Sequence, residues 1–226
     1  ALDSTVVNTA VPAMAEALSV TPLGMRTALT SYVLTLAILI PASPWLCDRL
    51  GTRRVFGIAI MVFGVGSLAC GLAQTLPQLV AARVLQGIGG ASLMPVGRYV
   101  LVRSIDKHEF VRAMSTVATF GLLGSVLGPL LGGALVEFTS WRLIFLINVP
   151  VAIAGVWMNK RDMPDYRLDH ANRFDLPGFL LFAAASALLL TASELAGAHP
   201  VPWGRIGLCG QLALLLGAVY VWHSRR

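Results

Sequence analysis

Charged residues are scarce in this sequence. They make up 12% of its 226 residues, about half of their share in a soluble domain, which excludes a chain that is solvated over most of its surface. Hydrophobic residues make up 56%, and apolar stretches near the ~20 residues that cross a bilayer recur along the whole length. The composition therefore predicts an all-α membrane protein that contacts the lipid bilayer.

Cysteine is rare as well, and sequence motifs of enzymes are missing. The three cysteines, Cys47, Cys70 and Cys209, each lie in or beside an apolar segment, a pattern that favours neither a disulfide framework nor a metal site. No glycine-rich loop ends in Lys-Ser or Lys-Thr, which argues against an ATP-driven pump. We therefore expect no enzyme activity, no metal and no cofactor.

Eight apolar spans are predicted, and the positive charges between them give their orientation. A first span ends near Ala17 and is too short to cross a bilayer, so we expect the sequence to begin inside this helix. The loops after spans two, four, six and eight hold 13 of the 17 Lys and Arg residues, and the alternate loops hold three. Positive residues stay on the cytoplasmic side, which predicts a cytoplasmic N-terminus. The remaining spans lie at roughly 26–46, 55–73, 77–98, 113–136, 141–158, 177–196 and 204–223.

The first six spans contain an internal repeat. Residues 44–56 align with residues 133–145, and this alignment pairs Arg53 with Arg142. The first segment lies in a cytoplasmic loop and the second in an outer loop. Opposite sides are what an inverted repeat of spans 1–3 and spans 4–6 requires.

Five segments are similar to sequence motifs of one transporter family. They resemble the first-helix, loop 2–3, fourth-helix, fifth-helix and sixth-helix motifs of the major facilitator superfamily, in its fourteen-span drug:proton antiporter branch. Multidrug exporters of enterobacterial type are the members that they resemble most. The segments are residues 2–12 (LDSTVVNTAVP), 46–54 (LCDRLGTRR), 83–90 (RVLQGIGG), 124–133 (GSVLGPLLGG) and 141–150 (WRLIFLINVP).

The resemblance implies a division of the chain into three parts. Residues 1–158 would form the N-terminal six-helix bundle of a major facilitator, built as a 3+3 inverted repeat. Residues 159–176 would form a cytoplasmic loop, and residues 177–226 two additional membrane helices. A second six-helix domain of the same protein would be the structural partner of this chain.

Two charged residues inside the spans are candidates for proton coupling. Asp3 is the only acid within the hydrophobic part of the first six spans. A charge at the bilayer centre costs ~2.5–3.5 kcal/mol on insertion scales, so such residues usually face the bundle interior and carry function. Arg83 is predicted at a comparable depth in span four, and the resemblance implies that it is a core functional residue. The alternatives are that Asp3 lies at the aqueous edge and that Arg83 reaches the outer interface.

The loop 2–3 motif supplies a second candidate site. Its charges would serve as a topology signal without any further role, but the resemblance implies a gating loop, in which Asp48 joins a charge network at a helix end. Pro44 stands where the family motif opens with glycine, and a proline prevents the close helix contact that glycine allows. The candidate gating residues are Asp48, Arg49, Gly51, Arg53 and Arg54.

Small residues form two adjacent rows along the fifth span, at positions 121, 125, 129 and 133 and at positions 124, 128 and 132. Their spacing fits ordinary close packing between membrane helices. The resemblance implies instead an antiporter helix, whose smooth, proline-bent face lets two halves of a transporter move against each other. The residues that match this motif are Gly124, Gly128, Pro129, Gly132 and Gly133.

These features together predict a proton-coupled secondary transporter in the cell membrane. It would export drugs or small amphipathic molecules, and a proton from outside would neutralise Asp3 and release the exported molecule from a central cavity. Its partners would be the small-molecule substrate and protons. No nucleic-acid partner is expected, because the basic residues behind the net charge of +6 are topology signals. An exporter of one specific metabolite and a membrane scaffold or sensor that does not transport are the alternatives.

Cysteine-accessibility labelling tests the predicted topology. Single cysteines near Thr52, Lys107 and Arg167 should react only from the cytoplasmic side, and single cysteines near Pro22 and His199 only from outside, because the charge asymmetry places these loops on opposite faces. Labelling of position 52 from the outside would refute the span assignment.

Overall fold

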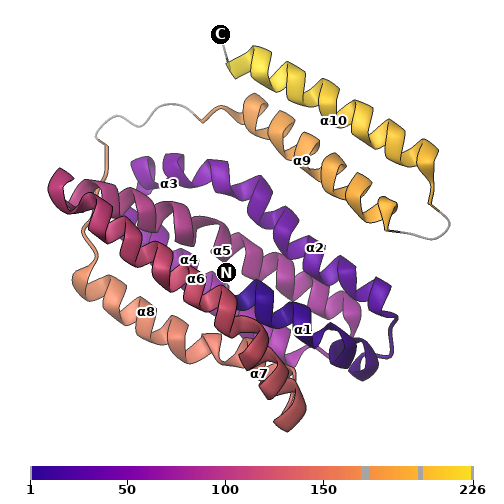
Figure 1. The fold of residues 1–226 in the computed structure, drawn as a ribbon. Coiled ribbons are helices and arrows are strands. Elements are labelled where there is room, and N and C mark those ends of the chain that lie inside the picture. The colour runs from indigo at the N-terminus through magenta and orange to yellow at the C-terminus, as the bar shows by residue number, and fades with distance from the viewer. Residues whose placement is uncertain (1, 169–173, 198–200, 225–226) are drawn as a thin grey trace.

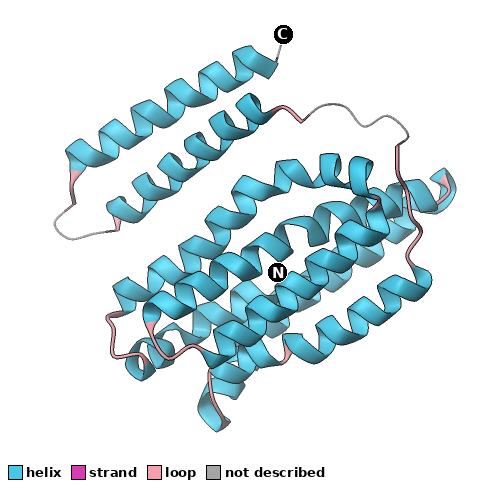
Figure 2. Cartoon of the chain, turned by 180° about the vertical axis from the view of Figure 1, so that it is seen from behind, coloured by secondary structure: helices cyan, strands magenta, loops and turns pink. Residues whose placement is uncertain are grey.

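The computed structural model describes residues 2–168, 174–197 and 201–224, apart from the side chains at positions 2–5, 22–23, 107, 131 and 136. Every regular element in this part of the chain is a helix (Figures 1 and 2). The elements are α1 (Leu2–Ala17), α2 (Pro22–Leu39), the 3₁₀ turn η1 (Ile40–Ala42), α3 (Ser43–Leu50), α4 (Thr52–Leu72), α5 (Leu76–Ser104), α6 (Lys107–Phe138), α7 (Arg142–Leu146), α8 (Asn148–Asp162), α9 (Leu176–Ala196) and α10 (Trp203–Ser224).

Seven helical stretches among the described residues are long and apolar enough to cross a membrane. They follow the predicted spans two to eight, so the all-α membrane fold is confirmed. The stretch Gly24–Leu50 joins α2, η1 and α3, and the stretch Arg142–Asp162 joins α7 and α8. Helix α1 has 16 residues and corresponds to the short first span.

Prolines explain why two of these stretches are interrupted. Pro150 has no amide hydrogen to donate to the carbonyl group of Leu146, and α7 ends at that residue. Pro41 lies inside the turn that separates α2 from α3. Helix α8 continues to Asp162, four residues past the end predicted for the sixth span at 158.

The packing of the helices follows the inverted repeat. The units are α1 to α4 and α5 to α8, and the first helix of each unit packs against the second helix of the other: α1 against α6, and α5 against α2 (Figure 1). The third helices, α4 and α8, pack against each other. This exchange between units is the arrangement that the repeat in the sequence predicts. Helices α9 and α10 form a hairpin that packs through α9 on α2.

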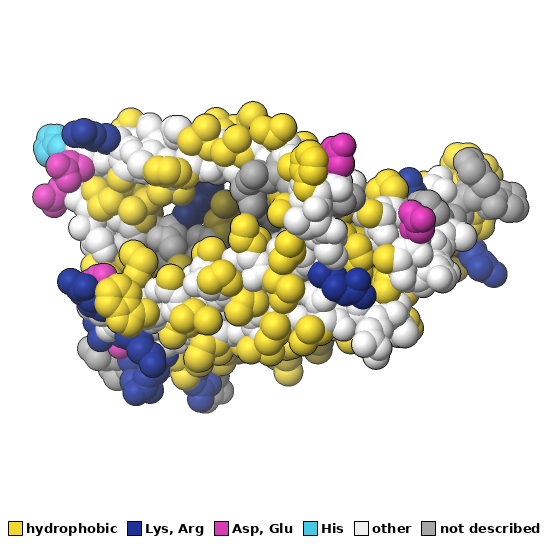
Figure 3. Space-filling model, turned by 90° about the horizontal axis from the view of Figure 1, so that it is seen from below, with side chains coloured by type: hydrophobic (Ala, Val, Ile, Leu, Met, Phe, Trp, Pro, Cys, Tyr) yellow, Lys and Arg dark blue, Asp and Glu magenta, His cyan; other side chains and the backbone are white. Residues whose placement is uncertain are grey.

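The molecular surface is suited to a bilayer. Large hydrophobic side chains are exposed on α2, α4, α5, α6, α8, α9 and α10, for example Val65 on α4, Phe120 on α6 and Leu214 on α10. Figure 3 shows a mostly hydrophobic flank, with many Lys and Arg side chains gathered at one end. Apolar side chains on the outside and charge at one end are what a membrane-embedded bundle requires.

Glycines let α4 and α5 approach within backbone contact. A Cβ added at Gly66 would stand 2.5 Å from the backbone nitrogen of Gln86, and one added at Gly89 would stand 2.6 Å from the carbonyl oxygen of Ala59. The neighbouring atoms belong to the backbone, so they cannot rotate away. Small residues of this kind supply the close packing that associates helices in a membrane.

Replacing Gly89 by alanine should therefore destabilise the bundle by about 1–3 kcal/mol, because α4 and α5 must separate to admit the methyl group. Gly97 lies on the same helix and has no neighbour within 4 Å of an added Cβ, so Gly97→Ala is the matched control and should be neutral or slightly stabilising. Thermal unfolding of the full-length protein in detergent measures both effects. Equal melting temperatures for the two variants would contradict the packing assigned to Gly89.

Candidate functional site

Arg83 is buried at the centre of the helix bundle. It lies on α5 with 2% of its surface exposed. Its guanidinium group stands 4.1 Å from the ring centroid of Tyr32 on α2 and 5.6 Å from that of Phe145 on α7. Aromatic faces attract a desolvated cation, which offsets part of the cost of burial. Arg83 is thus a core residue, and the alternative that it reaches the outer interface is excluded.

A chain of buried polar groups extends from Arg83 across the bundle. Arg83 Nη1 donates a hydrogen bond of 2.6 Å to Gln86 Oε1, and Gln86 Nε2 donates one of 2.6 Å to Ser67 Oγ on α4. Asn148 Nδ2 on α8 lies 3.5 Å from the same hydroxyl. Gln86 and Ser67 have no exposed surface. In such a low-dielectric setting these bonds hold the guanidinium group in a fixed orientation.

Sequence reasoning selected Arg83 but not the other members of this chain. Gln86 lies three residues after Arg83, a spacing that puts the two side chains on one face of a helix. That spacing could have identified Gln86. Ser67 and Asn148 are far from Arg83 in sequence, and nothing in their local sequence indicates the contact.

Asp3 lies in the first turn of α1, and its side chain is outside the described part of the structure. The expected pairing of Asp3 with Arg83 therefore stays a prediction.

The loop 2–3 motif forms the turn between α3 and α4. Gly51 has a φ of 89°, a conformation that glycine adopts at little cost. Asp48 lies in the last turn of α3, where its Oδ1 accepts a hydrogen bond of 2.9 Å from the Tyr99 hydroxyl group. The acid at the beginning of α4 is a different one, Asp165, which accepts a 3.2 Å hydrogen bond from the backbone amide of Arg53. At the start of α4, the carboxylate that the helix N-terminus favours is thus Asp165, and the charge network expected of Asp48 stays a prediction.

The segment 163–168 holds this turn in place. The Thr52 hydroxyl group donates to the carbonyl oxygen of Pro164 at 2.9 Å and accepts from the amide of Tyr166 at 2.9 Å. The Thr52 amide donates to the carbonyl oxygen of Tyr166 at 3.1 Å. Helix α4 has no side-chain cap from its own N-cap residue, so these contacts satisfy amide groups that a helix start leaves without partners. Sequence reasoning did not find this segment, because it lies more than a hundred residues further along the chain.

The other gating candidates lie around this turn. Arg49 stands 5.3 Å from the ring centroid of Trp45, and Arg54 is exposed. Pro44 is exposed at the start of α3 and does not interrupt the helix. The close approach to α5 is made by Ser43, which is fully buried and donates a hydrogen bond of 3.2 Å to the carbonyl oxygen of Ala91. Pro44 itself is exposed, so the loss of helix contact expected at position 44 stays a prediction.

The two rows of small residues on α6 have different surroundings. Gly128 and Gly132 are buried, and a Cβ added at Gly132 would meet Thr9 Oγ1 and the carbonyl oxygen of Val6 on α1. In the other row, Pro129 and Gly133 are exposed, and nothing lies within 4 Å of a Cβ added at Gly133. Gly124 is half-buried in the first row. Close packing explains the row of Gly128 and Gly132, whereas the row of Pro129 and Gly133 faces away from this chain's helices.

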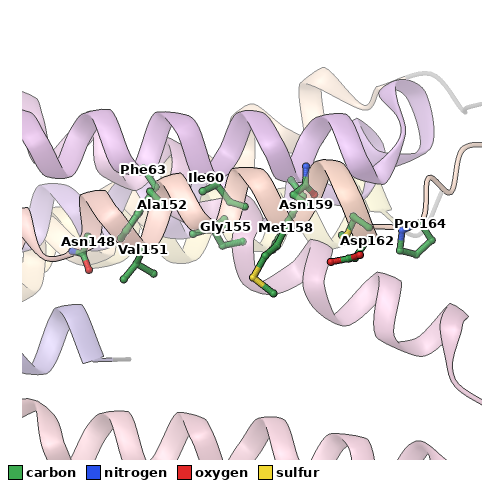
Figure 4. A pocket seen from close by; sticks show the side chains of 13 residues that line it. Ile60, Phe63, Asn148, Val151, Ala152, Gly155, Met158, Asn159, Asp162 and Pro164 are labelled. Carbon is green, nitrogen blue, oxygen red and sulfur yellow. The ribbon is translucent and has the colours of Figure 1, made fainter.

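An apolar groove of about 500 Å³ runs along α8 (Figure 4). Phe63 and Ile60 of α4 line it together with Met158 of α8. Asn148, the last member of the polar chain, lies at one end of the groove, and Pro164 of the segment 163–168 lies at the other (Figure 4). The groove thus extends from the buried polar groups to the loop 2–3 turn.

Asp175 is the N-cap residue of α9 and lies outside the membrane spans. It links the start of α9 to His223 in the last turn of α10. The Gly178 amide donates to this carboxylate at 3.0 Å, and His223 Nε2 lies 2.9 Å from it. The Gly178 hydrogen bond first, and His223 second, hold the pKa of Asp175 below its usual value. A lowered pKa means that the contact stabilises the hairpin above the ordinary carboxylate pKa and is lost as the pH falls through the lowered value.

The described residues contain no group of three His, Cys, Asp or Glu side chains that could hold a metal ion. The chain of polar groups described above consists of an arginine, two amides and a hydroxyl group. They can hold an ion pair or an amphipathic molecule by charge and hydrogen bonds, and none of them is an activated nucleophile.

Comparison with known proteins agrees with this architecture. The family model of the Major Facilitator Superfamily matches residues 1–223. A putative multidrug resistance protein MdtD from Salmonella typhi is 47% identical over the whole chain, and the one from Salmonella typhimurium is 46% identical. The chain spans about half the length of these relatives, 48% of each.

Two solved transporter structures share the fold at low sequence identity. A bacterial homologue of the human lysosomal transporter Spinster, in an inward-facing and unoccupied conformation, matches 95% of the chain with a TM-score of 0.60 and 21% identity. An auto-inhibited POT family peptide transporter matches 95% with a TM-score of 0.59 and 17% identity. The chain covers 52% and 48% of these two structures. The family match over nearly all of the sequence, together with the exchanged packing of two three-helix units, shows that this chain belongs to the major facilitator superfamily.

Proposed function

We propose that this chain is the N-terminal part of a proton-coupled exporter of drugs or other small amphipathic molecules, with its N-terminus in the cytoplasm of the cell. The observation that carries the proposal is the buried Arg83, held between two aromatic rings and hydrogen-bonded to Gln86. A fixed cation inside a membrane bundle marks a site that handles charge. The relatives named multidrug resistance proteins support a drug as the exported molecule.

In this proposal Asp3 is the residue that binds and releases the proton. Val6 and Val7, one helical turn after position 3, are buried in the same apolar cluster as Phe145, whose ring faces Arg83. The spacing of three and four residues aligns position 3 with this buried face of α1. An ionised Asp3 would be attracted to Arg83, and protonation would remove that attraction. The hydrogen bond from Arg83 to Gln86 would keep the guanidinium group in place in both states.

The groove along α8 supports an amphipathic substrate. Its wall is formed almost wholly by apolar side chains such as Phe63 and Met158, and Asn148 supplies a polar group at the end nearest Arg83. A molecule with an apolar body and one polar or cationic group matches this distribution. Binding pockets for small molecules commonly combine an apolar wall with a few polar groups that fix orientation.

The remaining site residues receive roles that depend on the second half of the protein. We assign gating to Asp48, Arg49, Gly51, Arg53 and Arg54 in the turn between α3 and α4. We assign the exposed row of α6, with Pro129 and Gly133, to the contact with the missing six-helix domain. The buried glycines of α6 support this contact by holding α6 against α1.

Two other functions fit part of these observations. The exported molecule could be one specific metabolite, which the same groove and polar chain would accept. A membrane scaffold or sensor that does not transport is the second alternative. Transport assays of the full-length protein separate them: several unrelated drugs exported indicate a multidrug exporter, one compound exported indicates a metabolite exporter, and no transport indicates a scaffold.

Asp3→Asn tests the proton site in the full-length protein. The amide keeps the size of the side chain but cannot ionise, so drug binding should persist while export driven by a pH gradient falls to the level of protein-free liposomes. Glu16→Gln is the matched control, because Glu16 is exposed at the other end of the same helix, and this variant should export normally. Wild-type export by the Asp3→Asn protein would place the coupling site elsewhere.

Adjacent glycines of α6 test the two assigned surfaces. Gly132→Ala should lower the melting temperature, because the added methyl group collides with Thr9 and Val6. Gly133→Ala should leave the melting temperature unchanged but slow export about tenfold, since the methyl group would meet only the second domain. If Gly133→Ala protein exports at the wild-type rate, its row does not contact the moving half.

A further inference from the structure

Helices α4 and α8, the third helices of the two repeat units, form an antiparallel pair with a close interface. Three glycines spaced seven residues apart on α4, Gly57, Gly64 and Gly71, face the sixth span. An added Cβ would stand 2.7–2.8 Å from the facing residue at each of them. The facing residues are Asn159, Ala152 and Leu146, respectively. A move of seven residues along α4 thus corresponds to a move of six or seven residues in the opposite direction along the sixth span. The two helices therefore keep the same packing register over the length of the pair.

At the cytoplasmic end of this pair, Arg53 links the two helices by a hydrogen bond. Arg53 is the second residue of α4, and its Nε donates a hydrogen bond of 2.6 Å to the carbonyl oxygen of Met163. Met163 is the C-cap residue that directly follows α8. The last carbonyl groups of a helix have no partner within the helix and carry partial negative charge. An arginine at the start of one helix therefore caps the end of the other.

At the outer end of the pair, Arg142 links the two helices in the same way. Arg142 is the first residue of α7, which leads into α8, and its Nη2 donates a hydrogen bond of 3.0 Å to the carbonyl oxygen of Ala73. Ala73 is the C-cap residue that directly follows α4. The ring of Trp141 lies 4.4 Å from the Arg142 guanidinium group and limits the directions in which that group can turn.

The inverted repeat relates the two caps to each other. Arg53 and Arg142 occupy matching positions in the aligned segments 44–56 and 133–145. Each starts the third span of its unit and binds the end of the other unit's third span. The two repeat units thus share the arginine-to-carbonyl hydrogen bond as well as the arrangement of their helices.

We propose that Arg53 and Arg142 are reciprocal helix caps that position the two faces of the transporter, so that the loop 2–3 turn has a counterpart on the outer face at Arg142. Arg142 is then a positioning residue, which acts through the end of α4 and touches neither proton nor substrate. Its contribution to the transport rate rests on the proposed export function, whereas the capping itself does not.

Hydrogen exchange of the full-length protein tests the capping without reference to transport. Arg142→Ala should speed amide exchange about tenfold in residues 70–74 at the end of α4 and leave residues 160–164 unchanged, because the variant removes one charge-assisted hydrogen bond. Arg53→Ala should give the opposite pattern, with faster exchange in residues 160–164 only. Arg205→Ala is the control, since Arg205 is an exposed arginine in the first turn of α10 and should change neither segment.

The crossed pattern is what separates reciprocal capping from a general loss of stability. Faster exchange in both segments for either variant, or in neither, would overturn the proposal. Arg142→Lys keeps a charged donor and should restore most of the protection.

Transport adds a test of positioning. Rates per folded transporter should fall about tenfold in Arg142→Ala, with KM unchanged because the substrate groove is separate from Ala73. A crossed exchange pattern with wild-type turnover would reduce Arg142 to a packing role and overturn its positioning role. An inactive wild-type protein would instead refute the export function, while the exchange pattern would still decide the capping.

Discussion

A buried guanidinium group is the constraint on which the rest of this bundle depends. Arg83 brings a guanidinium group into the membrane, so the protein must surround it with aromatic faces and hydrogen-bond acceptors. Tyr32 and Phe145 supply the faces and Gln86 supplies an acceptor. These residues come from α2, α7 and α5, so three helices must meet closely at one depth.

Glycine makes that meeting possible. Gly66 lets the backbone of α4 touch α5 beside Gln86, which brings Ser67 within hydrogen-bonding distance of the same amide. A larger residue at position 66 would separate the helices and leave the amide of Gln86 without this partner. A buried polar group without a hydrogen-bond partner is costly inside a membrane bundle. The close packing of α4 on α5 is therefore also what gives the Gln86 amide its partner.

The sequence predicted the features that depend on local composition. Hydropathy located the spans, positive residues indicated an orientation, and the alignment of Arg53 with Arg142 predicted an inverted repeat that the helix packing confirms. It did not predict contacts between distant segments. Asp165 at the start of α4 and Ser67 beside Gln86 depend on how helices cross, and polar residues of these types are ordinary in any sequence. The fifth span shows the same limit, because its two small-residue rows look alike in sequence and differ only in whether α1 covers them.

In the proposed exporter, substrate movement is coupled to proton movement in the opposite direction. The most direct measurement uses the full-length protein in liposomes that enclose a pH-sensitive dye, without an imposed pH gradient, and adds an amphipathic cation such as ethidium outside. If the proposed exchange occurs, ethidium uptake is accompanied by a rise in the internal pH, because protons leave as ethidium enters. Ethidium uptake at a measurable rate with constant internal pH would contradict it.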